Sequence, residues 1–134
     1  MQLSKDFNLS EFTYSRAAIE HGIDNQPGEE ALANLSALVE KVLQPLRDAL
    51  GAPLFITSGY RNDEVNRLVG GVADSQHRRG EAADCYHPAG PRYLLGILRE
   101  RKIPFDQAIV YRRKKFLHVS YRREGKNRGE VVRK

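Results

Sequence analysis

The chain has 134 residues, of which 40% are hydrophobic and 29% are charged, and it carries a net charge of +5. This is the size and composition of one globular domain, which excludes a second independently folding unit and a disordered chain. The single cysteine, Cys85, excludes an intramolecular disulfide scaffold. No apolar run reaches the ~20 residues of a membrane span, and the first residues lack the apolar stretch of a secretory signal. We therefore expect no membrane span and a protein that is cytoplasmic as synthesised.

The positive charge is concentrated towards the C-terminus. Residues 112–134 contain ten basic and two acidic residues, whereas residues 1–111 contain 12 basic and 15 acidic ones. We predict a domain over residues 1–122 and a basic tail over residues 123–134. Such a tail can attract nucleic acid, an anionic cell wall or another polyanion nonspecifically, or it can simply keep the surface solvated.

Apolar spacing, capping residues and glycines predict helices at residues 10–21, 29–50 and 91–102. Pro45 lies inside the second pattern and predicts a kink or a break there, because proline lacks a backbone donor. Short β-prone runs predict strands at residues 54–57, 105–111 and 116–121, with the basic residues 112–115 as a hairpin between the last two.

Between these elements, residues 58–91 are rich in glycine and in polar residues, which is typical of a site carried on loops. Helices first and a sheet later predict an α+β domain, with helices packed on a small, mostly antiparallel sheet.

Two of the histidines are candidates for metal ligands. His77 is followed seven residues later by Asp84, and His118 lies in a strand-like run whose alternation places Phe116, His118 and Ser120 on one face. Two imidazoles and a carboxylate are the ligand set of a catalytic zinc site with one open position. The same ligands bind non-haem iron, and a strand histidine is often only hydrogen-bonded, so spacing alone leaves these alternatives open.

Several motifs together carry a resemblance to a known family. They are Ser58-Gly59-Tyr60-Arg61, Val69-Gly70-Gly71, the run from Ser75 to Asp84, and Leu117-His118-Val119-Ser120. The chain resembles the zinc D-alanyl-D-alanine carboxypeptidase family, peptidoglycan metallopeptidases related to the hedgehog domain, over residues 5–121. A second group of segments is similar to the small single-domain variant of bacteriophages and bacterial genomes, which includes endolysins: Leu9-Ser10-Glu11-Phe12, Gly22-Ile23-Asp24-Asn25 and Gln44-Pro45-Leu46-Arg47.

The resemblance implies that His77, Asp84 and His118 bind zinc, that Arg61 faces the substrate peptide and that Ser75 lies near it. It implies a hydrolase, a zinc peptidase that cleaves peptidoglycan stem or cross-bridge peptides near a D-alanine. We expect a monomer that acts on the cell wall after release. From the residues alone, Arg61 could equally be solvated and Ser75 could be a loop hydrogen-bond partner.

The chain departs from the family at the catalytic base. The family supplies a carboxylate on the strand before its last histidine ligand, but the two corresponding positions here are Tyr111 and Lys115. We expect Asp106 to act as the base and Tyr111 to stabilise the oxyanion. Alternatively, Asp106 is a structural residue and His87 serves as the base.

The missing carboxylate leaves a second function open, a zinc-containing but weak or inactive peptidoglycan-binding module. A third, nucleic-acid binding through the basic residues, lacks a helix-turn-helix or an aromatic RNA motif.

Overall fold

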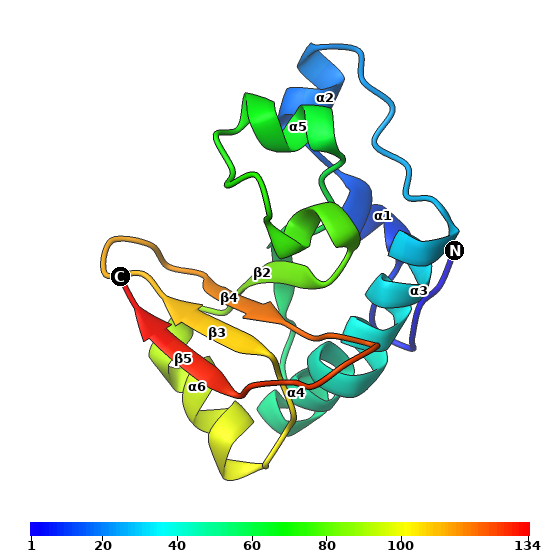
Figure 1. Cartoon of the computed structure of the whole chain (residues 1–134). Coiled ribbons are helices and arrows are strands. Elements are labelled where there is room, and N and C mark those ends of the chain that lie inside the picture. Colours follow the sequence, from blue (N-terminus) through cyan, green and yellow to red (C-terminus); the bar gives the residue numbers. More distant parts are fainter.

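The computed structural model describes residues 1–134, and it confirms an α+β fold with helices packed on one five-stranded sheet (Figure 1). The strands follow the order β1-β2-β4-β3-β5, and every neighbouring pair is antiparallel except β3 and β5. Their bounds are β1 (Phe55–Ser58), β2 (Ala82–Tyr86), β3 (Gln107–Val110), β4 (Leu117–Ser120) and β5 (Glu130–Arg133). The sheet is therefore mostly antiparallel, as the sequence predicts.

The first expected helix, residues 10–21, is two short helices, α1 (Leu9–Thr13) and α2 (Arg16–Glu20). Tyr14 between them is extended, and the Ser15 side chain accepts a hydrogen bond from the Ala18 amide to start the second helix. A capping serine inside the pattern thus ends one helix and begins another.

The expected helix over residues 29–50 is one uninterrupted helical run. It consists of α3 (Glu29–Leu38), a π-helical turn η1 (Val39–Leu43) and α4 (Gln44–Leu50), and it ends at Gly51, whose φ is 67°. Pro45 lies in the first turn of α4 and has no amide to donate back to Lys41. The π-helical turn immediately before it accommodates this loss without the predicted break.

The remaining helices are α5 (Asp63–Leu68), a short 3-10 helix η2 (Gln76–Arg79) and α6 (Pro91–Glu100). Of these, α6 was expected, whereas α5, η2 and strand β2 lie in the segment that the sequence describes only as loop-rich. No helix is long and apolar enough to cross a membrane.

The hydrophobic core lies against one face of the sheet. Side chains of β2 and β4 such as Cys85, Leu117 and Val119 are fully buried there among the leucines of α3, α4 and α6. Figure 1 shows α6 behind the sheet. Burial raises the pKa of the Cys85 thiol, which behaves as a small apolar residue. Because strand side chains alternate, Asp84 and His118 point to the opposite face.

The C-terminal segment differs from the expected tail. Strand β5 pairs in parallel with β3, with Gln107 opposite Glu130, and its Val131 packs against the core. The Gly129 and Glu130 amides also donate to the Phe105 and Asp106 carbonyls. The sequence pattern does not predict this strand, because its two valines are flanked by charged residues and form no longer β-prone run. Residues 130–133 are thus part of the domain's sheet.

Candidate metal centre

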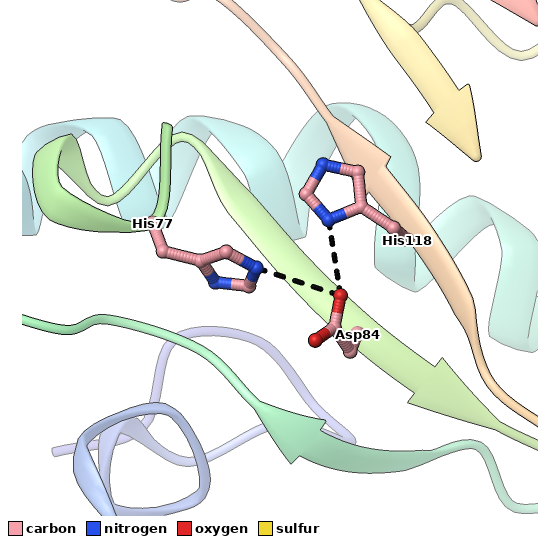
Figure 2. A group of neighbouring side chains, drawn as sticks. All are labelled: His77, Asp84 and His118. Carbon is pink, nitrogen blue, oxygen red and sulfur yellow. Dashed lines mark hydrogen bonds and ion pairs between the residues drawn. The ribbon is translucent and has the colours of Figure 1, made fainter. Parts of the chain in front are cut away.

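His77, Asp84 and His118 come together on the sheet face away from the core. Asp84 on β2 and His118 on β4 are direct cross-strand partners, while His77 comes from η2. The Asp84 Oδ1 atom lies 3.0 Å from His118 Nδ1 and 3.5 Å from His77 Nε2. Figure 2 shows the three side chains pointing towards one another. The sheet register and η2 therefore assemble a group that can hold a metal ion.

The ring of His77 is held in one orientation. Its Nδ1 lies 2.7 Å from the Gly59 carbonyl oxygen, to which it donates, so Nε2 remains free to face Asp84. The Ser75 hydroxyl accepts from the His77 amide and caps η2, and Gly80 ends η2 with a φ of 75°. A Cβ at position 59 would come within 2.7 Å of the Phe12 backbone, so only glycine permits this carbonyl position.

The three donor atoms lie within 4.8 Å of one another, and the two distances from Asp84 match a tetrahedral zinc ion. Ligand atoms ~2.0–2.1 Å from such an ion lie ~3.3 Å apart, and the two Asp84–histidine distances, 3.0 and 3.5 Å, lie on either side of this value. Burial alone raises the pKa of Asp84, but its contacts with the imidazoles of His118 and His77 outweigh it and lower the pKa to about 2. Asp84 is therefore ionised at neutral pH, which is the form that binds a cation.

The three residues lie in a cleft of about 900 Å³ that also contains Arg61, Ser75 and Tyr111. The Arg61 Nε atom is buried in it without a hydrogen-bond partner. Burial lowers the pKa of Arg61, while the nearby Asp84 and Tyr111 act in the opposite direction. The Nη atoms of Arg61 also form no hydrogen bond but are not buried, so they are free to bind a ligand carboxylate in the cleft.

The comparison with protein families agrees with this geometry. The sequence model of the peptidase M15 family matches residues 5–120. The chain belongs to the peptidase M15 family. A search of curated proteins finds no match.

Tyr111 of this M15 peptidase lines the cleft with its ring tilted against Phe116. Burial raises the pKa of its phenol, and the neighbouring Asp84 raises it further while Arg61 opposes this. The phenol is therefore protonated at neutral pH, so it can donate a hydrogen bond and cannot act as a base.

Asp106 also lines the cleft, but its carboxylate is fully engaged. It accepts hydrogen bonds from the amide, Nε and Nη2 of Arg128 and from Nε2 of Gln76. Burial alone raises the pKa of Asp106, but the hydrogen bonds from Arg128 outweigh it and lower the pKa. These contacts favour a role in holding the C-terminal segment against the metal-bearing segment. His87 accepts from the Ala89 amide and is not among the residues lining the cleft.

The sequence analysis missed several residues that build the site. The Gly59 carbonyl orients His77, and Gln76 and Arg128 hold Asp106. Glu81 lines the cleft and pairs with Arg79, 2.9 Å away. Of these residues, only Gly59 had a signal, since a glycine immediately after a strand within a recognised motif indicates a close backbone approach.

Proposed function

We propose that the protein is a zinc-dependent peptidase that hydrolyses peptidoglycan stem or cross-bridge peptides near a D-alanine. The observation that carries this proposal is the unpartnered Arg61 guanidinium in the same cleft as the His77, Asp84 and His118 ligand group. A terminal peptide carboxylate held by Arg61 would place the adjoining peptide bond over the metal. A carboxylate on the terminal residue is what such a site recognises.

The residues divide the reaction between them. Hydrolysis breaks the C–N bond, with the water hydroxyl going to the carbonyl carbon and its remaining proton going to the leaving amine. His77, Asp84 and His118 would hold zinc, which when bound supplies a Lewis acid and lowers the pKa of water to about 7. Arg61 orients the substrate, and the Tyr111 hydroxyl donates to the carbonyl oxygen as its negative charge develops.

The role with the least support in this arrangement is that of the acceptor for the proton of the attacking water. Asp106 and Glu81 are both engaged by arginines, and Tyr111 is protonated. General-base assistance is worth ~10²–10⁴ in rate, so we expect a slow but measurable enzyme. The engagement of the Asp106 carboxylate by Arg128 supports the structural alternative for this residue rather than the role of base.

The decisive experiment is incubation of purified peptidoglycan with the zinc-loaded protein, followed by mass spectrometry of the soluble fragments. We expect new peptide fragments that disappear with a chelator and return with zinc. The matched control is His118→Ala, which removes one ligand. Fragments that are equally abundant with the chelator or with this variant would contradict a zinc-dependent reaction.

A second candidate, a peptidoglycan-binding module without turnover, is favoured by Tyr111 standing where the family has an acid. The variant Tyr111→Glu separates the two. If the wild-type chain is only a binding module, it gives no fragments and Tyr111→Glu creates activity. If it is an enzyme that uses Tyr111 as a donor, the wild-type chain is active and removal of the hydroxyl by Tyr111→Phe slows it.

A further inference from the structure

A second, smaller cavity adjoins the metal cleft. It measures about 370 Å³ and is lined by Tyr111, Arg112, Arg113, Lys114 and Lys134. Tyr111, Lys114 and Lys134 line the metal cleft as well, so the two spaces share a wall. Apart from Tyr111, all the residues that line the smaller cavity are cationic.

The backbone fixes this cluster of cations. The Lys134 amide donates to the Val110 carbonyl, and the Arg112 amide donates to the Lys134 carbonyl at 2.7 Å, which extends the pairing of β3 with β5. The Lys114 amide donates to the Tyr111 carbonyl and closes the turn between β3 and β4. Residues from two distant parts of the sequence are thus held together by the sheet.

The charges of this cluster are unbalanced. Arg112, Arg113, Lys114 and Lys134 form no ion pair with an acidic side chain within 4.0 Å. No acidic side chain lines the cavity. Four like charges around one space repel one another, and an anionic group between them relieves the repulsion.

We propose that Arg112, Arg113, Lys114 and Lys134 form an anion subsite that selects peptides with a second carboxylate beyond the one held at Arg61. This rests on the proposed peptidase function. The preferred ligand is an acidic peptide, because the cavity opens into the cleft in which the peptide bond is cut. An extended peptide advances ~3.3–3.6 Å per residue, so a side-chain carboxylate within a few residues of the cut bond reaches past Tyr111.

The test compares two cleavable peptides that differ only in one residue, glutamate or glutamine, placed in turn at successive positions beside the cut bond. At low salt we expect kcat/KM for the glutamate peptide to exceed that for its partner by about 3- to 10-fold at one position, the size of a few exposed charge contacts. The preference should fall towards unity in 0.5 M salt, because salt screens exposed charges.

The variant Lys114→Gln/Lys134→Gln should lose most of this preference. Its matched control, Lys115→Gln/Lys126→Gln, has the same net charge, but neither lysine lines either cavity. The control should therefore keep the preference. Equal loss in both variants, or no preference at any position in the wild-type protein, would overturn the subsite.

A binding measurement separates this proposal from the proposed function. Isothermal titration calorimetry of the zinc-loaded protein with uncleavable analogues of the same peptides, in which a ketomethylene group replaces the scissile amide, measures affinity without turnover. Tighter binding of the glutamate peptide, lost only in Lys114→Gln/Lys134→Gln, supports the subsite even if no hydrolysis occurs. Hydrolysis with equal affinity and equal kcat/KM for the two peptides keeps the peptidase and rejects the subsite.

Discussion

Charged side chains line both the inner end of the cleft and its border with the basic cavity, but their pairing differs. Around Gln76, the Asp106 carboxylate is bonded to Arg128 and Glu81 is paired with Arg79. Around Tyr111, by contrast, Lys114 and Lys134 have no ion-pair partner, and the Arg61 Nε lacks any partner. The paired groups hold segments of the chain together, whereas the unpaired ones are available to a ligand.

This difference separates structural from functional residues among the charged side chains of the cleft. A change in a paired group should act mainly on stability, because it leaves its partner without a bond. A change in an unpaired group should act mainly on substrate binding and turnover. Changes in the metal ligands should reduce activity more than changes in either set.

The largest effect is expected for the metal ligands. In His77→Ala or His118→Ala we expect zinc content to fall well below one per chain and turnover to fall by at least ~10³-fold, since metal catalysis supplies several kcal/mol. Metal analysis of the folded variants and a peptide assay check this. His21→Ala, a change at an exposed histidine far from the cleft, is the control and should keep both. Wild-type zinc content in both ligand variants would refute the assignment.

Tyr111 comes next. The variant Tyr111→Phe should lower kcat by ~10²–10³-fold while zinc content stays the same, because it removes a donor to the developing oxyanion and keeps the ring. Steady-state kinetics with parallel metal analysis measures both. Its neighbour in the tilted aromatic pair gives the control: Phe116→Leu disturbs the packing but removes no donor. An unchanged kcat in Tyr111→Phe would show that the phenol has no part in the chemistry.

Arg61 tests the unpaired charges directly. The variant Arg61→Lys keeps the charge but loses the planar fork, so kcat/KM should fall by ~10–100-fold on peptides with a free terminal carboxylate. On the same peptides with an amidated terminus, the wild-type protein and the variant should differ much less. Arg67→Lys, on the exposed side of α5, is the control. A loss of equal size on both kinds of peptide would argue against carboxylate recognition.

The sequence predicted the elements whose signals are local. The α+β class, α6 and the β3–β4 hairpin follow from periodicity and turn residues, and the motif resemblance brought out His77, Asp84 and His118, which the structure brings together. Local patterns could not show what depends on distant pairing. Strand β5 is defined by its partner β3, and the Asp106–Arg128 bond joins residues on either side of β4.

The same limitation applies to the orientation of the ligands. That Gly59 supplies the carbonyl for His77 depends on how η2 lies against residues 59–61, and the sequence between them contains only turn residues and a short helix. The cavity between Tyr111 and Lys134 likewise exists only because β5 returns to the edge of the sheet. The sequence shows that residues 112–134 are strongly basic, but it does not show which of these residues surround one cavity.

The smallest effect on activity, and a clear effect on stability, is expected for Asp106→Asn. The Asp106 side chain is fully buried and Arg128 is 51% exposed, so the neutral variant should lose about 1–3 kcal/mol of unfolding free energy. The folded-state pKa of Asp106 is lowered, so its stabilisation is complete above the unfolded value of ~3.9 and is lost as the pH falls through the folded pKa. The difference in unfolding free energy between wild type and variant, measured by urea unfolding, should therefore be full at pH 7 and shrink below about pH 4.

The pH–rate profile of Asp106→Asn gives the second measurement. Retention of its acidic limb in a destabilised Asp106→Asn protein fits a paired, structural carboxylate, whereas loss of that limb at unchanged stability would make Asp106 the base and break the distinction between paired and unpaired charges.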